Sequence, residues 1–561
     1  MLLVSALVSC EYFPIEIPDT SGGEGGTGTN PGTENNGGNS SGNNQGNNQG
    51  NNQGNNQGNN QGNNQGNNQG NNQGNGQGNG NCLTSAMHVD SDANGICDNC
   101  TADVVVTLDL YGINDLHGKV FDTDSQIGVD ELTTYLKNAE SRDEEYVFLS
   151  SGDMWQGSAE SNITKGMLVT DWMNHLGFAS MTLGNHEYDW GEQYVRDNAE
   201  LAEFPFLAIN VYDRTTQKRV EYCAPSVVVE RGELKIGIIG AIGDCYSSIS
   251  SDKVQGIYFK VGSELTALVK AESQRLRSEE GVDLVVYAIH DGYDSSASGE
   301  LSSSRISSYY SSELSSGGYV DVVFEGHTHQ KYTFYDSYGV YHIQNGGDNK
   351  NGIAHIELDV NYVTDGVKVI AAGVVSYLTY SSMEKDGIVD ALREKYAEEI
   401  GNAFGTVGYN SKYRDDSDIE QLTAELYYQL GVQTWGEEYS IVLGGGFLRT
   451  RSPYNLYAGE VTYSDLMMLM PFDNEIVLCS IKGRDLYNKF FNTSNDDYYV
   501  AYGDYGAGVK ANIDQNATYY VVVDMYTAQY SYNNLTVVAY YDSYTFARDL
   551  LAEYIRNGGL E

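Results

Sequence analysis

The feature that most constrains the fold is a series of short apolar, β-branched runs between residues 103 and 375, which alternate with stretches of helical periodicity. Two of those stretches, residues 129–139 and 264–280, carry apolar side chains at helical spacing. Alternating strands and helices favour a layered α/β domain. The expected strands are residues 104–110, 146–149, 179–183, 234–240, 284–289 and 320–324.

A short polar motif follows directly on five apolar runs, and five of the nine histidines in the chain lie in these motifs. Open α/β folds place their sites beyond the carboxyl ends of strands, so we expect the motifs to meet at one site. Coincidence is a poor explanation for such a series. The motifs are Asn114-Asp115-Leu116-His117-Gly118, Gly152-Asp153, Gly184-Asn185-His186-Glu187, His290-Asp291-Gly292 and Gly326-His327-Thr328-His329.

These motifs supply enough oxygen and imidazole ligands for two adjacent divalent metal ions. Asp153 has two carboxylate oxygens and is therefore suited to bridge the ions. Mixed O/N ligation suits manganese, zinc or iron, and less well magnesium or calcium. Two metals a few ångströms apart are an arrangement that cleaves phosphoesters. We expect one ion to take Asp115, His117, Asp153 and His329, and the other to take Asp153, Asn185, His290 and His327.

The charge balance excludes one class of partner. The chain has 77 acidic and 32 basic residues, for a formal net charge of −45. A nucleic-acid polymer needs a basic footprint, so we expect no such partner. An anionic substrate gains nothing from the global field and must be held by local cations.

The N-terminal residues predict an anchor and a tether. Residues 1–10 are a short apolar run that ends in Leu7-Val8-Ser9-Cys10. This run resembles the lipobox of bacterial lipoproteins, in which the Cys is lipidated, although no Lys or Arg precedes it. Residues 11–81 include eight copies of Gly-Asn-Asn-Gln and few apolar side chains, which favours a flexible tether. We therefore expect attachment to a membrane through Cys10 only, on the outside of a bacterial cell, or secretion.

Residues 82–101 form a small Cys- and Asp-rich module with several open interpretations. The Asp90-x-Asp92-x-Asn94-Gly95 stretch has the alternating oxygens and turn glycine of a calcium loop. Alternatively, the module is a zinc site, a disulfide within the Cys-x-x-Cys pair, or a turn without any metal. The zinc alternative would use Cys82, His88, Cys97 and Cys100.

The rest of the chain predicts a second α/β domain. We place the catalytic domain at residues 102–375, a charged linker helix at residues 376–402 and the C-terminal domain at residues 403–561. In that last domain we expect helices at residues 417–430 and 548–556 and strands at residues 441–447 and 518–524.

The motif series resembles that of the calcineurin-like metallophosphatases. The forms Asn-Asp-x-His-Gly, Gly-Asn-His-Glu-x-Asp and Gly-His-x-His resemble those of the 5′-nucleotidase family. The resemblance covers about residues 103–556 and implies a four-layer α/β/β/α catalytic domain. It further implies that His186 is the catalytic imidazole and that Asp189 orients it. His186 would stabilise the transition state or protonate the leaving oxygen.

The same resemblance implies substrate-binding residues in the C-terminal domain. Arg449, in Gly444-Gly445-Gly446-Phe447-Leu448-Arg449, matches an Arg that holds the substrate phosphate. Phe472 matches a ring that stacks on the base and lies in Pro471-Phe472-Asp473-Asn474, which also brings Asn474 to the site. Arg414 is a second candidate for the phosphate.

One departure from the family puts base and sugar specificity in doubt. The family has an aromatic residue followed closely by Gly-Gly-Asp, whereas here Tyr526 is followed by Thr527-Ala528-Gln529. Tyr526 is the candidate for the second stacking ring.

We therefore expect an extracellular, monomeric, dinuclear-metal phosphoesterase that hydrolyses nucleoside monophosphates. The enzyme alternatives are a 2′,3′-cyclic nucleotide phosphodiesterase/3′-nucleotidase and a nucleotide-sugar pyrophosphatase. An alternative of another class is a surface adhesin or binding protein that kept the fold and lost turnover. The complete ligand set argues against that loss.

Overall fold

The computed structural model describes residues 82, 88–122, 128–141, 145–293, 310–347, 352–446, 455–491, 500–503, 513–529, 534–542 and 545–561. The predicted signal at residues 1–10, with Cys10, and the predicted tether at residues 11–81 lie outside the described residues, as does Arg449. None of the helices in the described ranges has the length and apolar character needed to cross a bilayer.

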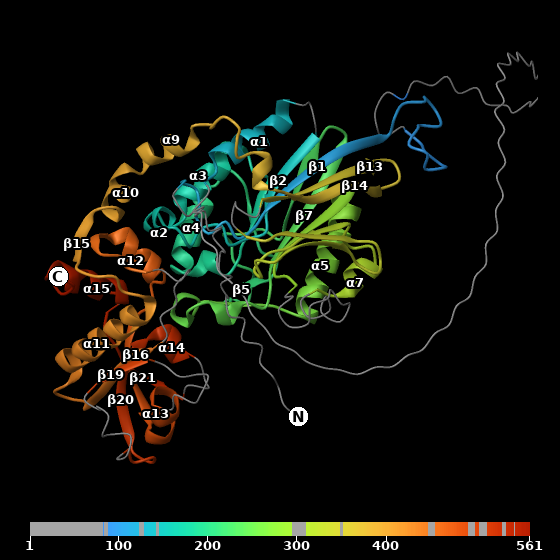
Figure 1. Cartoon of the computed structure of the whole chain (residues 1–561). Helices are drawn as coiled ribbons and strands as arrows, with labels where there is room; N and C mark the ends of the chain where they lie inside the picture. Colours follow the sequence, from blue (N-terminus) through green and yellow to red (C-terminus); the bar gives the residue numbers. More distant parts are fainter. Residues whose placement is uncertain are drawn as a thin grey trace, which may run out of the picture. The chain divides into compact units, whose positions relative to one another are not determined.

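The first sheet of the catalytic domain has the strand order β14-β13-β1-β2-β3-β4, of which Figure 1 labels β14, β13, β1 and β2. Strands β1 to β4 run parallel to one another, and β13 pairs antiparallel with β1 and β14. The strands are β1 (Val105–Ile113), β2 (Glu145–Ser150), β3 (Ser180–Thr182), β4 (Phe206–Leu207), β13 (Ile353–Asn361) and β14 (Gly366–Val375).

The second sheet has the order β11-β12-β10-β9-β7-β6, with a parallel centre and antiparallel edge strands. Its strands are β6 (Ser226–Arg231), β7 (Leu234–Ile242), β9 (Leu284–His290), β10 (Val322–Phe324), β11 (Lys331–Tyr335) and β12 (Tyr341–Asn345). A separate two-stranded ribbon joins β5 (Val211–Asp213) to β8 (Ile257–Phe259). All six strands expected from the sequence are therefore present.

Three hydrophobic clusters show that the domain has four layers. Leu108 and Leu110 of β1 pack in a cluster between the two sheets, whereas Tyr111 and Ile113 belong to a cluster with helices outside the first sheet. Successive strand side chains point to opposite faces, which places each residue in one interface or the other. The helices on this side are α1 (Asp130–Ser141), α2 (Ala159–Ile163), α3 (Met167–Leu176) and α4 (Glu192–Leu201).

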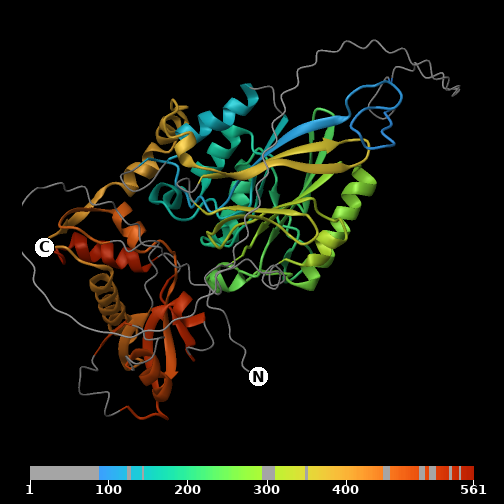
Figure 2. The ribbon, with the colours of Figure 1, turned by 45° about the vertical axis from the view of Figure 1, so that its right-hand side comes forward.

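The third cluster lies between the second sheet and the helices α5 (Ser263–Arg275) and α7 (Ser312–Ser316). In Figures 1 and 2 these two helices lie on the outer side of the sheet that contains β7. The α/β/β/α layering implied by the family resemblance is therefore confirmed. The expected helix at residues 264–280 is α5 continued by one π-helical turn, Leu276–Glu280.

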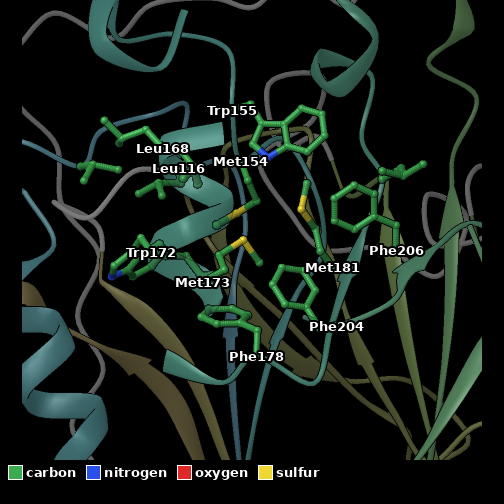
Figure 3. Packing of buried hydrophobic residues seen from close by; sticks show 14 of the residues in the cluster. Leu116, Met154, Trp155, Leu168, Trp172, Met173, Phe178, Met181, Phe204 and Phe206 are labelled. Atoms are coloured by element: carbon green, nitrogen blue, oxygen red, sulfur yellow. The ribbon is translucent and has the colours of Figure 1, made fainter. Parts of the chain in front are cut away.

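Large side chains fill the interface between the first sheet and its helices. Trp155 and Trp172 are fully buried, and Trp172 Nε1 donates to Thr133 Oγ1 at 2.9 Å. Figure 3 shows Met154, Met173 and Met181 among the aromatic rings of this cluster. Met154 and Trp155 directly follow Asp153, so burial of these two side chains fixes the backbone that carries a predicted metal ligand.

The C-terminal domain is built on a five-stranded sheet with the order β19-β16-β20-β18-β21. One face packs on α11 (Asp416–Trp435) and the other on α13 (Gly483–Phe490) and α14 (Met525–Gln529). The pair β15 (Thr406–Asn410) and β17 (Gly459–Thr462) packs with α12 (Tyr463–Leu469) and α15 (Ala547–Arg556). The strands of the sheet are β16 (Ile441–Gly446), β18 (Ile476–Lys482), β19 (Val500–Gly503), β20 (Thr518–Asp524) and β21 (Thr536–Tyr540).

The segment expected as a linker helix, residues 376–402, contains the 3₁₀ turn Tyr377–Thr379 and two α-helices. These are α9 (Ile388–Lys395) and α10 (Ala397–Ala403), which meet at Tyr396. Tyr396 leaves the helical backbone region with φ −106° and ψ 27°, and its hydroxyl donates to Asp171 Oδ2 at 2.5 Å. Its ring belongs to the cluster outside the first sheet. Burial of this one side chain therefore coincides with the interruption of the helix.

Candidate active site

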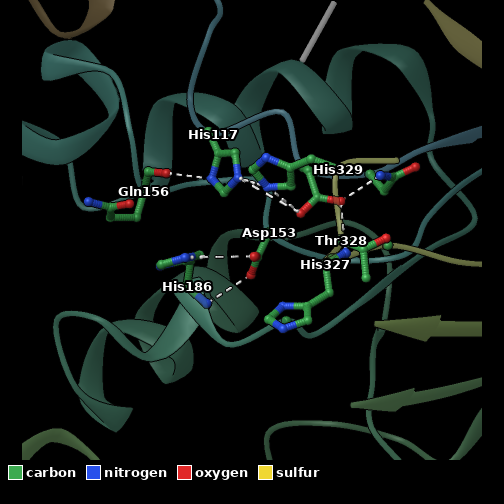
Figure 4. Close-up of polar contacts among 12 residues, drawn as sticks. His117, Asp153, Gln156, His186, His327, Thr328 and His329 are labelled. Atoms are coloured by element: carbon green, nitrogen blue, oxygen red, sulfur yellow. Dashed lines mark hydrogen bonds and ion pairs between the residues drawn. The ribbon is translucent and has the colours of Figure 1, made fainter. Parts of the chain in front are cut away.

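Five loops meet where the parallel strands of both sheets end, as the sequence predicts. The loop after β1 is tied to the loop after β2, because Asp115 N–H donates to Gly152 O at 2.9 Å and His117 N–H donates to Asp153 O at 3.1 Å. His327 N–H donates to Asp115 Oδ2 at 3.0 Å, which joins the loop after β10. Figure 4 shows side chains of these three loops, among them His117, Asp153, His327 and His329, close to one another.

An unusual backbone conformation is shared by most of the predicted metal ligands. Positive φ angles between 51° and 70° occur at five of the seven. Non-glycine residues rarely adopt the left-handed region, and strained conformations of this kind cost on the order of 1–3 kcal/mol each. Such strain persists where surrounding contacts fix it, and it clusters at functional sites. The five residues are Asp115, His117, Asp153, His327 and His329.

The first cluster of ligating atoms contains Asp115, His117 and His329, all within 4.8 Å of one another. His329 Nε2 lies 3.1 Å from Asp115 Oδ1 and 2.9 Å from His117 Nε2. His117 Nδ1 lies 2.8 Å from the carbonyl oxygen of Gln156, which can only accept, so Nδ1 carries the proton. His117 Nε2 then presents a lone pair to the cluster, as a metal ligand requires.

The second cluster contains Asp153, His290 and His327, with ligating atoms again within 4.8 Å of one another. His290 Nε2 lies 3.0 Å from Asp153 Oδ2, and His290 Nδ1 donates to Ser151 O at 2.8 Å. Burial opposes ionisation of His290, but the charge of Asp153 outweighs it and raises the pKa of His290 to about 10. Burial and the charge of His290 lower the pKa of His327 to about 4. The buried negative charge of Asp153 therefore favours a positive charge beside it.

Asn185 Oδ1 and Asn185 Nδ2 are buried without a hydrogen-bond partner. Asp115 Oδ1 and His290 Nε2 also make no hydrogen bond, and each faces an ion-pair partner, His329 and Asp153 respectively. An unsatisfied buried polar group costs about 1–3 kcal/mol, so these groups are rarely left in this state. Three of the four atoms can donate a lone pair to a divalent cation. The residues present therefore fit two metal ions with mixed oxygen and nitrogen ligands.

The predicted His186–Asp189 pair is formed. His186 begins a short 3₁₀ turn after β3, and its Nδ1 lies 2.6 Å from Asp189 Oδ2. The backbone N–H of His186 donates to Asp153 Oδ1 at 2.8 Å, and His186 Nε2 lies 4.0 Å from Asp153 Oδ2. Asp189 therefore fixes one ring nitrogen while the other is directed at the Asp153 cluster.

Glu187 has a positioning role that sequence reasoning missed, although it stands inside the Gly-Asn-His-Glu motif. Its buried carboxylate accepts the backbone N–H groups of Gly184, Asp153 and Met154 at 2.6, 2.9 and 2.8 Å. It thereby joins the loops after β2 and β3. Burial and the charge of Asp153 raise the pKa of Glu187 to about 7.

Gln344 of β12 was also missed and holds the loop that carries two histidines. Its Nε2 donates to Gly326 O at 3.0 Å. Its Oε1 accepts from Thr328 Oγ1 at 3.1 Å and from Gln330 N–H at 2.9 Å. Three bonds from one amide therefore fix the backbone on both sides of His327 and His329.

Glycine is required at two positions of the site. A Cβ at Gly152, whose φ is 96°, would lie 2.6 Å from His290 Nδ1. A Cβ at Gly184 would overlap Asp153 Oδ1. The two glycines of the motifs thus allow loops from different strands to approach each other closely.

Among the predicted substrate residues, Phe472 is brought to the site. Its ring stacks on His186 with centroids 6.0 Å apart and an interplanar angle of 27°. Asn474 is half-buried two residues further on, and Tyr526 is half-buried on α14. Arg414 is held within the C-terminal domain, where its Nε donates to Asn410 Oδ1 at 3.0 Å.

A buried ionic network fixes the segment that carries Phe472. Asp473 pairs with Lys165 of the catalytic domain at 2.7 Å and also with Arg548. Gln156 Nε2 donates to Pro471 O at 3.2 Å, and Arg548 Nη1 donates to Met470 O at 3.3 Å. Neighbours on both sides of Phe472 are therefore bonded to the catalytic domain or to α15.

Two family models match the chain in the same order as its two domains. Residues 109–331 match the calcineurin-like phosphoesterase family and residues 399–543 match the 5′-nucleotidase C-terminal domain. The chain belongs to the 5′-nucleotidase family of calcineurin-like metallophosphatases. It is therefore a phosphoester hydrolase, and the Asp/His clusters are the groups of the described chain that fit the divalent ions of this family.

Curated relatives of the family resemble the chain at low identity. An apyrase of Tabanus yao is 26% identical over 420 residues, which cover 68% of this chain and 72% of the relative. A 5′-nucleotidase of Vibrio cholerae is 23% identical, with 69% of this chain and 75% of the relative covered. The different names of these relatives leave the substrate to be argued from the site.

Solved structures resemble the same fold. A 5′-nucleotidase precursor of Thermus thermophilus has a TM-score of 0.55 and 18% identity, over 80% of this chain and 96% of that one. A sulfate thiohydrolase of the same organism has a TM-score of 0.53 and 16% identity, over 81% and 94%. Since both share the two-domain fold, the fold alone does not determine the substrate.

Proposed function

We propose that this member of the 5′-nucleotidase family hydrolyses nucleoside monophosphates to nucleoside and phosphate. The observation that carries the proposal is the position of Phe472, which stacks on His186 beside two clusters of metal-ligating side chains. An aromatic ring beside a phosphoester-cleaving centre suits a substrate with a flat base attached to its phosphate through a sugar.

The site would hold two divalent ions. One would be bound by Asp115, His117, Asp153 and His329, and the other by Asp153, Asn185, His290 and His327. These ligand types favour manganese, zinc or iron over magnesium or calcium. Bound there, the ions would neutralise the phosphate and lower the pKa of an attacking water. Asp153 is the ligand proposed to be common to both ions.

His186 is proposed to act on the leaving oxygen of the ester. Asp189 holds the proton of His186 on Nδ1, and stabilises the imidazolium, so that Nε2 can deliver a proton to the departing nucleoside oxygen. The C-terminal domain would supply Arg449 and Arg414 to the phosphate and Phe472, Asn474 and Tyr526 to the nucleoside. Since no Gly-Gly-Asp follows Tyr526, stacking without a directional hydrogen bond would accept purines and pyrimidines alike.

Substitution of Phe472 tests the nucleotide assignment. Loss of one stacking ring, which contributes on the order of 1–3 kcal/mol, should raise KM for AMP roughly 5- to 150-fold in the Phe472→Ala variant. Hydrolysis of p-nitrophenyl phosphate should change little, because that ester has no base to stack. The matched control is Phe404→Ala, since Phe404 is an exposed ring outside the site. An equal loss on both substrates would show that Phe472 supports the fold, and the nucleotide assignment would be withdrawn.

A substrate panel separates the enzyme alternatives. We expect faster hydrolysis of AMP than of 2′,3′-cyclic AMP or UDP-glucose at equal concentration, with the nucleoside and nucleotide products measured by chromatography. A preference for the cyclic ester or for the nucleotide sugar would replace the monophosphatase assignment by the corresponding alternative. A chain that hydrolyses none of these substrates would be the binding protein instead.

We also propose an extracellular location, with the monomer attached through a lipidated Cys10. The support is the lipobox-like run at residues 1–10 and the uncharged repeat that follows it. Mass spectrometry of the membrane-extracted protein should find an acylated Cys10 as the first residue. An unmodified N-terminus on membrane-free protein would contradict the anchor.

A further inference from the structure

A third group of metal-ligating side chains lies in the segment that precedes β1. The sulfur atoms of Cys82, Cys97 and Cys100 all lie within 4.8 Å of one another. Cys82 Sγ and Cys97 Sγ are 3.8 Å apart. Cys97 is buried and the other two side chains are half-buried.

This segment is attached to the turn between β13 and β14. His88 Nδ1 lies 2.7 Å from the hydroxyl of Tyr362, and Asn361 Nδ2 donates to Asp90 Oδ2 at 2.6 Å. Tyr362 N–H also donates to Val104 O at 3.2 Å. The group of cysteines therefore belongs to a segment with a defined place on the catalytic domain.

The contacts of this segment do not favour a zinc site that includes His88 or a calcium loop at residues 90–95. His88 is bonded to Tyr362 and is not a member of the sulfur group. Asp90 accepts the backbone N–H groups of Asn94 and Gly95 at 3.0 and 2.9 Å, which closes an Asx-type turn. Within the described ranges, the carboxylates of this loop do not form a metal-ligating group of three.

The spacing of the sulfurs suits one tetrahedral ion. With a zinc–sulfur bond of about 2.3 Å, two thiolates on a tetrahedral ion lie about 3.8 Å apart. A disulfide would require a separation of about 2.05 Å and would leave one of the three cysteines over. Cys97 and Cys100 also have the Cys-x-x-Cys spacing that is typical of structural zinc sites.

A backbone donor faces the sulfur of Cys97. Val89 N–H donates to Cys97 Sγ at 3.4 Å. Such a donor favours the thiolate, which is the form of cysteine that binds a metal ion.

We propose that Cys82, Cys97 and Cys100 form a three-thiolate site for a soft divalent cation, with zinc as the first candidate. A small ligand such as water takes the fourth position of the tetrahedron. The bound ion joins Cys82 to the Cys97–Cys100 turn, in the segment that is bonded to the turn between β13 and β14. This site is separate from the phosphoesterase reaction, and neither depends on the other.

The test uses cobalt as a spectroscopic probe in the full-length chain, purified without reductant or chelator. Cobalt bound by thiolates has a sulfur-to-metal charge-transfer band in the near ultraviolet, which the Asp/His clusters cannot produce. The wild type should show this band, and its zinc content should exceed that of the Cys97→Ser/Cys100→Ser variant by about one ion per chain. The matched control, Cys479→Ser, changes a buried cysteine of β18 and should keep both signals.

Two results would overturn the proposal. One is an equal zinc content and no charge-transfer band in either protein. The other is a disulfide between any two of Cys82, Cys97 and Cys100, detected by peptide mapping without reduction. Hydrolysis of p-nitrophenyl phosphate within about twofold of wild type would show that the double variant is folded. If it is not folded, Cys82→Ser gives the same readouts without altering the Cys-x-x-Cys turn. An inactive protein that keeps the cobalt band would refute the phosphoesterase assignment alone.

Discussion

At the scale of single residues, the site combines strained backbone with unsatisfied polar atoms. Asp115, His117 and Asp153 adopt left-handed conformations that are unfavourable for these side chains. Asn185 Oδ1 and Asn185 Nδ2 are buried without a hydrogen-bond partner. Both costs are offset if the folded chain binds cations, because ligand binding stabilises the native state.

Substitution of His186 separates a proton donor from a metal ligand. His186→Ala should lower kcat for AMP by roughly 10²–10⁴, the usual contribution of general acid–base catalysis. Asp189→Asn should lower kcat by a smaller factor, because the imidazole remains and only its orientation is lost. Elemental analysis should find the wild-type metal content in both variants. Loss of metal from His186→Ala would show that this imidazole is a ligand.

The residue types of the site were visible in the sequence, but their supporting contacts were not. The predicted ligands follow apolar runs, and the ends of parallel strands bring such residues together whatever the detailed packing. Glu187 lies in one of the motifs, yet its three bonds to backbone amides depend on how the loops after β2 and β3 meet. Neither the periodicity nor the composition of the sequence predicts the contact between these two loops.

At the scale of elements, the segment from β10 to β12, which includes β11, forms a charged unit around the buried His342. His342 of β12 lies 2.7 Å from Glu325 Oε1 and 3.7 Å from Asp336 Oδ2. The rings of Phe334 and Tyr310 pack against the imidazole. Burial opposes its charge, but Glu325 and Asp336 outweigh burial and raise the pKa of His342 to about 9.

The stability of this unit should depend on pH with a defined sign. The pKa of His342 is raised from 6.5 to about 9 by folding. Its contribution is therefore fully present below pH 6.5 and is lost as the pH rises through 9. The loss should be on the order of 3 kcal/mol in the free energy of unfolding.

Urea denaturation at pH 6, 7.5 and 9 checks this dependence. The stability difference between wild type and His342→Gln should shrink as the pH rises. The control is His175→Gln, which changes a half-exposed histidine of α3 that pairs with Asp386. A difference between wild type and His342→Gln that stays constant from pH 6 to 9 would show that His342 is neutral in the folded protein.

The strands were predictable from sequence because their apolar runs are short, β-branched and bounded by turn residues. The break in the linker at Tyr396 was not predictable. Its helical pattern continues through this residue, and the interruption coincides with a buried ring and a hydrogen bond to Asp171 on α3. Tertiary packing overrides local propensity at such positions.

At the scale of the whole chain, one carboxylate connects parts that are remote in sequence. Asp473 lies 308 residues from Lys165 and 75 residues from Arg548, and it pairs with both. Burial disfavours its charge, but Arg548 and Lys165 hold the pKa of Asp473 below its usual value. Contacts over such separations leave no pattern in a single sequence, so this network could not be predicted.

Removal of this carboxylate should destabilise the protein strongly. In Asp473→Asn the buried Arg548 and the half-buried Lys165 lose their partner, which costs about 3–5 kcal/mol. The control is Asp485→Asn, whose partner Arg484 is 69% exposed, so that its loss should cost about 0–1 kcal/mol. Denaturant unfolding measures both. Equal stability of the two variants would mean that the network contributes little to holding the segment of Phe472.

The proposed site depends on Asp153 more than on any other residue, because we assign this carboxylate to both ions. The most direct test is phosphate release from AMP by Asp153→Ala, measured over a range of manganese concentrations. We expect activity far below about one-tenth of the wild-type value at every concentration, because no remaining ligand can join the two ions. Activity within about tenfold of wild type would contradict the dinuclear centre.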